Sequence, residues 1–181
     1  MAKRMVAVVL GGGTGTRFGA VLPKQLLVLG GRTLVEHCVA AFAAAPGIDE
    51  ILLVMPPAYH DEAKRLVGSQ VSAVIAGGAA RSDSGRHALA HVPPRETQYR
   101  AQTPQCFRLE VIAKAHALAA ADPAFTPTDD CGVVLRYLPD IPVHVVPGSE
   151  DNIKVTYPSD LEIAAALLRT RQVEATSEPP A

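Results

Sequence analysis

This sequence of 181 residues contains no tryptophan, only three cysteines, and no apolar run long enough to span a bilayer. The cysteines lie far apart without C-x-x-C spacing, which favours reduced, mostly buried thiols in the cytoplasm over a disulfide or zinc framework. Its 17 lysines and arginines are balanced by 18 aspartates and glutamates, so the basic excess typical of nucleic-acid binders is missing. These absences leave a soluble chain of one domain's length, with no membrane or nucleic-acid partner expected.

Glycines gather directly after an apolar segment near the N-terminus. Residues 5–10, MVAVVL, are apolar at every position, the pattern of a buried parallel strand. Four of residues 11–15 are glycines, which lack the Cβ atoms that would keep a ligand from the backbone N–H groups. Arg17 and Lys24 then supply two cations, and Pro23 stiffens the approach to Lys24. The whole segment predicts a polyphosphate site.

Other interpretations of this glycine-rich turn fit the sequence less well. A P-loop requires Gly-Lys followed by Ser or Thr, and this sequence contains neither combination. A dinucleotide fingerprint requires a third glycine where Phe18 stands, and an acidic residue after the second strand, where Pro56 and Pro57 stand. A purely structural turn is an alternative, which the two nearby cations make less favourable.

Strands and helices alternate through the first half of the chain, a pattern that predicts an α/β fold. Right-handed crossovers then give a mainly parallel sheet with helices on both faces and ligands at the carboxyl ends of the strands. We expect strands at 5–10, 51–55 and 71–75, and helices capped by Thr33, over 60–67 and from Arg81.

The second half predicts further elements of one domain over residues 1–170. We expect helices over 108–121, from a cap at Thr128 to Tyr137, and over 159–169, with a strand at 142–146. Residues 171–181 lose the apolar periodicity and are expected to form a disordered tail.

Five motifs in the same order resemble those of one enzyme family. They are GGGTGTRFG with LPKQ (11–25), GGAARSDS (77–84), RAQTPQCF (100–107), TDD (128–130) and EDNIKVT (150–156). The set is similar to the cytidylyltransferases that act on 2-C-methyl-D-erythritol 4-phosphate or on ribitol 5-phosphate. The resemblance covers about residues 5–168 and implies a Rossmann-like nucleotidyltransferase fold.

The resemblance is interrupted near residues 91–95. Family members carry there a central strand ending in a His-Asp-Ala-x-Arg-Pro motif, whose aspartate holds the catalytic metal, followed by an arm that commonly mediates dimerisation. About 50 residues are missing by this comparison, roughly two strand-plus-connection units. The far edge of the first strand should then lack its neighbour. An incomplete sequence, a natural internal truncation and a deliberate deletion are the three explanations.

By resemblance, the chain transfers a cytidylyl group from CTP to 2-C-methyl-D-erythritol 4-phosphate in the isoprenoid precursor pathway, forming a CDP-alcohol and releasing pyrophosphate. Ribitol 5-phosphate is the alternative acceptor. A truncated, non-catalytic relative that binds the nucleotide or a full-length partner is the alternative from another class. The resemblance also implies Mg²⁺ or another divalent cation and a homodimer, and the widely separated cysteines favour a cytoplasmic location.

The resemblance assigns roles to residues of the matched motifs. Charge neutralisation by fixed cations is the main demand of phosphoryl chemistry. No metal ligand is assigned, and a helix-capping role is favoured over a metal pair for Asp129 and Asp130. The catalytic set is Arg17, Lys24 and Lys154; the CTP set is Leu10, Gly11, Gly12, Gly13, Thr14, Gly15, Gly77, Gly78, Arg81 and Ser84; the polyol-phosphate set is Arg95, Thr103, Thr128 and Lys154.

Overall fold

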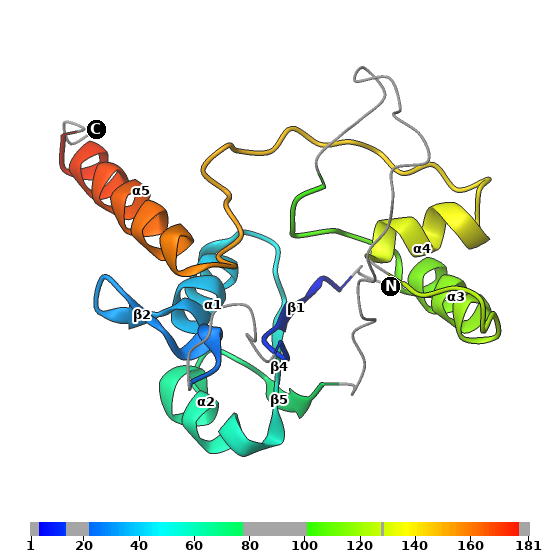
Figure 1. The fold of residues 1–181 in the computed structure, drawn as a ribbon, viewed down its shortest axis with the longest axis horizontal. Coiled ribbons are helices and arrows are strands. Elements are labelled where there is room, and N and C mark those ends of the chain that lie inside the picture. Colours follow the sequence, from blue (N-terminus) through cyan, green and yellow to red (C-terminus); the bar gives the residue numbers. More distant parts are fainter. Residues whose placement is uncertain (1–3, 14–21, 78–100, 128, 178–181) are drawn as a thin grey trace. The chain divides into compact units, whose positions relative to one another are not determined.

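A computed structural model describes residues 4–13, 22–77, 101–127 and 129–177 of the chain (Figure 1). These residues belong to two compact units: unit 1 comprises Met1–Ala79 with Ile153–Ala181, and unit 2 comprises Ala80–Asn152. The prediction of one domain over 1–170 stays a prediction.

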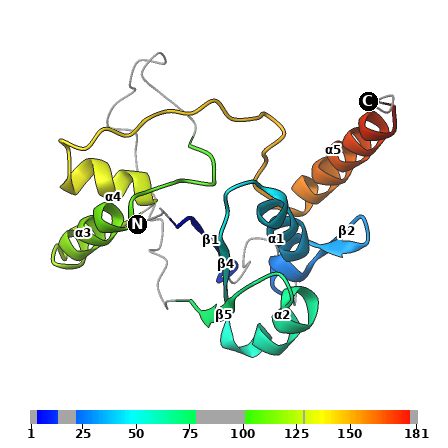
Figure 2. The ribbon, with the colours of Figure 1, turned by 180° about the vertical axis from the view of Figure 1, so that it is seen from behind.

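Unit 1 is built on a three-stranded parallel sheet. The strands β1 (Val6–Leu10), β4 (Glu50–Met55) and β5 (Ala73–Ala76) lie in the order β1-β4-β5. Both pairings are parallel, with β1 along β4 and β4 along β5, and Figure 2 shows the sheet from behind. The predicted parallel sheet is therefore confirmed. In the described part of the chain, β1 is an edge strand of this sheet, as the interrupted resemblance predicted.

Two helices cover one face of this sheet. Helix α1 (Leu34–Ala44) begins at Thr33, whose side chain and backbone form a reciprocal capping box with Glu36. Helix α2 (His60–Val67) follows the short helix η3 (Pro57–Tyr59). The core of unit 1 joins alternate strand residues to these helices: Ala7, Val9, Val35, Val39, Ile51, Leu53, Met55, Ala63 and Val67.

The other face of β1 is exposed. Successive side chains of a strand point to opposite faces of the sheet. Ala7 and Val9 are accordingly buried, whereas Val6, Val8 and Leu10 are 40%, 48% and 73% exposed. The predicted helix from Arg81 lies outside the described residues.

A hairpin and a long C-terminal helix complete unit 1. Strands β2 (Val28–Leu29) and β3 (Arg32–Thr33) pair antiparallel, and the turn between them places Gly30 and Gly31 at positive φ. Helix α5 (Pro158–Ser177) extends beyond its predicted end at 169, so that predicted end is wrong, whereas the disordered tail over 171–181 stays a prediction. No glycine or proline interrupts the chain between 159 and 177, so the helix has no breaker there.

Unit 2 contains the helices α3 (Leu109–Ala120) and α4 (Asp130–Tyr137), which confirm two predicted helices. Their shared core is small, made of Ala115, Ala119, Val133 and Val134. The predicted strand at 142–146 is wrong: these residues have no assigned regular structure and are exposed, and no partner strand is paired with them in the described residues. A strand needs a hydrogen-bonded neighbour to form.

The expectation of mostly buried cysteines is wrong, because Cys38 and Cys106 are exposed and Cys131 is half-buried. Among the described helices, none combines the length and apolar character that crossing a bilayer requires.

Candidate active site

The glycine turn begins where β1 ends. The Gly11 N–H group donates a 2.7 Å hydrogen bond to the Val54 carbonyl of β4, which continues the strand pairing by one residue. A Cβ atom on Gly11 would lie 2.5 Å from Sδ of Met55 and 2.8 Å from the Val54 oxygen. Only glycine fits this position without displacing β4. Because its N–H is engaged, Gly11 contributes space to a ligand site and leaves N–H donation to Gly12 and the residues after it.

A second glycine turn lies beside the first. Gly77 follows the end of β5, at the same carboxyl edge of the sheet as Gly12. A Cβ atom on Gly12 would be 4.0 Å from the Gly77 Cα, and one on Gly77 would be 3.2 Å from Cγ1 of Val54. The first and second segments predicted to bind CTP therefore meet over the end of β4. Leu10, the last residue of β1, is 73% exposed at this edge.

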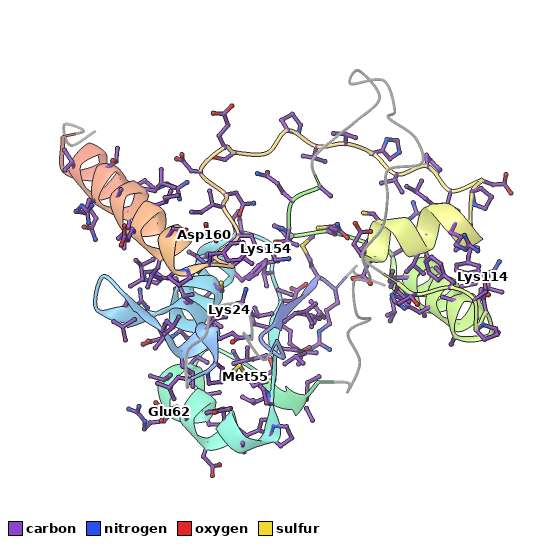
Figure 3. All side chains as sticks on the ribbon, viewed as in Figure 1. Lys24, Met55, Glu62, Lys114, Lys154 and Asp160 are labelled. Atoms are coloured by element: carbon purple, nitrogen blue, oxygen red, sulfur yellow. The ribbon has the colours of Figure 1, made fainter. Side chains whose placement is uncertain are left out.

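Lys24 lies on a short helix, η2 (Lys24–Leu26), which begins after the buried Pro23. Its ammonium group donates a 2.7 Å hydrogen bond to the carbonyl oxygen of Val155. Val155 directly follows Lys154, so two of the three predicted catalytic residues belong to segments of unit 1 that contact each other (Figure 3). Lys154 itself is exposed.

Asp160 adds a carboxylate to this region that the sequence analysis did not identify. Its Oδ2 accepts hydrogen bonds from the backbone N–H groups of Thr156 and Tyr157, at 2.7 and 2.8 Å. The Tyr157 and Thr156 N–H groups lower the pKa of Asp160, and the charge of Lys24 lowers this pKa further. A negative charge is therefore held near Lys24. An aspartate in the first turn of a predicted helix was the signal available for this contact.

Gln25 is the second residue that the sequence analysis missed. Its Nε2 donates to the carbonyl oxygens of Gly11, at 2.6 Å, and Gly13, at 3.0 Å. The LPKQ motif therefore contacts the glycine turn through Gln25 and the segment after Lys154 through Lys24. The family resemblance predicted that these motifs share one site, and the structure shows the hydrogen bonds that join them.

Unit 2 joins two further motifs through side-chain amides. Nε2 of Gln102 donates to the Ser149 carbonyl at 2.7 Å, and Nδ2 of Asn152 donates to the Thr103 carbonyl at 2.7 Å. These bonds fix the backbone at Thr103, a residue predicted to bind the polyol phosphate. The structure provides no contact that tests this role, which stays a prediction.

The pair Asp129 and Asp130 is a helix start. Oδ1 of Asp129 accepts a 2.6 Å hydrogen bond from the Gly132 N–H, which makes Asp129 the N-cap of α4. The favoured capping interpretation is confirmed, although Asp129 provides the cap that was expected from Thr128. Across the described ranges, no three histidine, cysteine, aspartate or glutamate side chains are grouped to hold a metal ion.

Eight predicted site residues lie outside the described part of the chain, and their roles stay predictions. They are Thr14, Gly15, Arg17, Gly78, Arg81, Ser84, Arg95 and Thr128.

Comparison with known proteins identifies the relatives of this chain. The family described as IspD: 2-C-methyl-D-erythritol 4-phosphate cytidylyltransferase matches residues 5–97 and 85–170. A protein of that name from Thermobifida fusca is 40% identical, with 92% of this chain and 94% of that protein covered. A Haemophilus influenzae protein, the bifunctional ribulose 5-phosphate reductase/CDP-ribitol pyrophosphorylase Bcs1, is 29% identical, with 93% and 49% covered.

Solved structures share the fold. The crystal structure of 4-diphosphocytidyl-2C-methyl-D-erythritol synthase from Anaerococcus prevotii has a TM-score of 0.74 at 21% sequence identity. It is matched over 92% of this chain and 96% of that chain. The predicted nucleotidyltransferase fold is confirmed.

The comparison with the Thermobifida fusca protein also exposes the interruption. That alignment spans 234 positions, which exceeds the 181 residues of this chain by 53. At least that many aligned positions therefore have no residue here. The two overlapping family matches, 5–97 and 85–170, place the break between the motifs at 77–84 and 100–107.

Proposed function

Because the chain belongs to the 2-C-methyl-D-erythritol 4-phosphate cytidylyltransferase family, we propose that it transfers a cytidylyl group from CTP to that acceptor. An oxygen of the acceptor phosphate attacks the α-phosphorus of CTP, the bond from the α-phosphorus to the bridging oxygen breaks, and pyrophosphate leaves. The product is a CDP-alcohol. The observation that carries the proposal is the meeting of the Gly12 and Gly77 turns at the carboxyl edge of a parallel sheet.

The chemistry asks the protein for positive charge and N–H donors around the phosphates. Negative charge accumulates on the non-bridging oxygens during attack and on the departing pyrophosphate. Gly12 supplies a backbone N–H at the turn, and Lys24, adjoining it through Gln25, supplies an ammonium group. In this proposal Lys24 and Arg17 neutralise the triphosphate, and Lys154 assists at the α-phosphate and the acceptor phosphate. Arg95, Thr103 and Thr128 hold the acceptor phosphate.

We propose that Mg²⁺ binds together with CTP. When bound, the ion neutralises charge on the phosphate chain, and Mg²⁺ commonly retains substrate phosphates and water among its ligands. The described residues offer no group of side chains that fits it, so no step is assigned to a protein-bound metal. A cytoplasmic location and a homodimer complete the proposal.

Pyrophosphate release from CTP tests the proposed function. The full chain would be incubated with Mg²⁺, CTP and either 2-C-methyl-D-erythritol 4-phosphate or ribitol 5-phosphate. Release with the first acceptor supports the proposal, and release with the second alone transfers it to the ribitol branch. Silence with both, from folded protein that still binds CTP, establishes the non-catalytic alternative, which the absent aligned positions favour.

Lys24 provides the matching variant. Lys24→Ala should lower kcat/KM for CTP about a hundredfold, the scale of losing one preorganised donor to developing charge. Lys64→Ala removes an exposed ammonium group from α2 and is the control. Equal activity of Lys24→Ala and Lys64→Ala would remove Lys24 from the mechanism.

A further inference from the structure

Gln25 makes contacts that give it a specific task at the glycine turn. One side-chain nitrogen, Nε2, donates to the carbonyls of both Gly11 and Gly13, at 2.6 and 3.0 Å. An amide nitrogen carries two hydrogens, so both are used. Exchanging the amide oxygen and nitrogen would place two acceptors against the amide oxygen, so the orientation is fixed by the contacts.

The carbonyl bonds determine where the Gly12 N–H points. In a planar trans peptide, the C=O of one residue and the N–H of the next point in opposite directions. Because the Gly11 carbonyl points at Gln25, the Gly12 N–H points away from Gln25. The Gly11 N–H, which belongs to the preceding peptide, donates to Val54, so hydrogen bonds hold the backbone on both sides of the Gly11 Cα.

The same side chain also has a buried oxygen that lacks a hydrogen bond. Its Oε1 is buried and has no hydrogen-bond partner in the described part of the chain. Buried polar atoms are nearly always paired, and exceptions in native structures call for an explanation. The two hydrogen bonds donated by Nε2 explain this exception, because they fix the plane of the amide group and with it the position of Oε1.

We propose that Gln25 is a positioning residue, which aims the Gly12 N–H at a phosphate group and fixes the glycine turn relative to Lys24. The inference rests on the proposed function for the identity of that phosphate, which is the triphosphate of CTP. Lys24 precedes Gln25 in the chain, and both belong to η2. The backbone donor and the ammonium group are therefore fixed by the same short helix. Displacements of about 1 Å at reacting groups reduce rates by up to a hundredfold, so this fixation matters to turnover.

Two variants remove the donated bonds without shortening the side chain. Gln25→Met removes both donors, and Gln25→Glu replaces them with an oxygen that faces two carbonyls. Gln70→Met and Gln70→Glu make the same changes at an exposed residue just after α2. Thermal unfolding of each variant establishes that the fold is retained, and Gln25→Met alone suffices if Gln25→Glu does not fold.

The first readout needs no turnover. Inorganic tripolyphosphate would be titrated into ¹⁵N-labelled full chain, and the Gly12 amide resonance would be followed by NMR. In wild type the resonance should shift and saturate, whereas Gln25→Met should need about ten times more tripolyphosphate, with the Gln70 variants like wild type. An unmoved Gly12 resonance in wild type, or an equal titration in Gln25→Met, overturns the inference.

The second readout separates positioning from folding. With CTP and the acceptor, kcat for Gln25→Met should fall about tenfold while KM for CTP changes less, because the folded variant still binds the base. Unchanged kcat in an active wild type overturns the inference and leaves the proposed function standing. Wild type without pyrophosphate release, but with a Gln25-dependent shift of Gly12, overturns the proposed function and leaves the inference standing.

Discussion

The two faces of β1 differ sharply in how far their side chains are exposed. Val9 is 8% exposed and packs with α1 and α2, whereas its neighbour Val8 is 48% exposed. Both are valines in one strand, paired with the same neighbour, β4. The difference therefore comes from what covers each face. The covered face contributes the core of unit 1. The glycine turns at the carboxyl edge of the sheet form although the other face of β1 is exposed.

This comparison bears on the 53 or more aligned positions that have no residue here. The family matches break between the motifs at 77–84 and 100–107, which both follow β5, so β1, β4, α1 and α2 all lie before the break. The Gly11 to Val54 hydrogen bond and the Gln25 contacts are therefore present with only one face of β1 covered. We therefore expect core substitutions to destroy the site and substitutions on the exposed face to leave it intact.

The largest effect is expected at the centre of the covered face. Leu53 is fully buried in β4, and Leu53→Ala removes apolar contacts and leaves a cavity. The free energy of unfolding should fall by about 2–5 kcal/mol, measured by urea denaturation. Leu135→Ala, on a side chain that is 54% exposed, is the control and should change stability by less than about 0.5 kcal/mol. A loss for Leu53→Ala as small as that expected for Leu135→Ala would contradict the stabilising role of this core.

The neighbouring valines of β1 test the comparison within one strand. Val9→Ala should cost about 2 kcal/mol, from two buried methyl groups and the space they leave. Val8→Ala should cost less than about 0.5 kcal/mol, because Val8 is half-exposed already. The same denaturation experiment measures both. Equal costs would mean that both faces of β1 are covered in solution.

Gly11 tests how closely β1 and β4 determine the turn. Gly11→Ala places a Cβ against Met55 and the Val54 carbonyl and should cost about 1–3 kcal/mol of stability. Gly12→Ala meets nothing closer than 3.9 Å, so it should cost less. Calorimetric unfolding compares the two variants. A larger cost at Gly12 would contradict the described packing of the turn.

The smallest effect concerns the cap of α1. Thr33→Ala should cost about 1 kcal/mol, whereas Thr33→Ser, which retains the hydroxyl, should cost little. The Thr33 hydroxyl and then its N–H lower the pKa of Glu36. The resulting stabilisation is complete above the unfolded pKa of Glu36 and is lost as pH falls through the lowered, folded pKa. Unfolding measured across that acidic range should therefore depend less on pH in Thr33→Ala than in wild type; equal dependence would contradict the role of the cap.

The sequence predicted the elements whose signals are local. The apolar run of β1 predicts a strand, and the capping box of Thr33 and Glu36 predicts a helix start, each from only a few residues. The strand expected at 142–146 failed because its apolar pattern needs a partner strand, which periodicity cannot supply. The end of α5 failed because loss of periodicity does not end a helix that has no glycine or proline.

Within the candidate site, the motifs were predictable and their contacts were not. Glycines and lysines indicate phosphate chemistry from their residue types, so Gly12, Gly77 and Lys24 were identified. Gln25 and Asp160 act on other parts of the protein through backbone groups, and glutamine and aspartate are common on surfaces. Their roles became visible only once the turn and the start of α5 were placed.

Hydrogen–deuterium exchange with and without CTP and Mg²⁺ tests the central claim most directly, that the nucleotide binds at the carboxyl edge of the β1-β4-β5 sheet. The account predicts slower exchange in peptides that contain Gly12, Lys24 and Gly77, with α3 unchanged. Slower exchange confined to α3 and α4, or no protection by CTP where NADH protects, would contradict it.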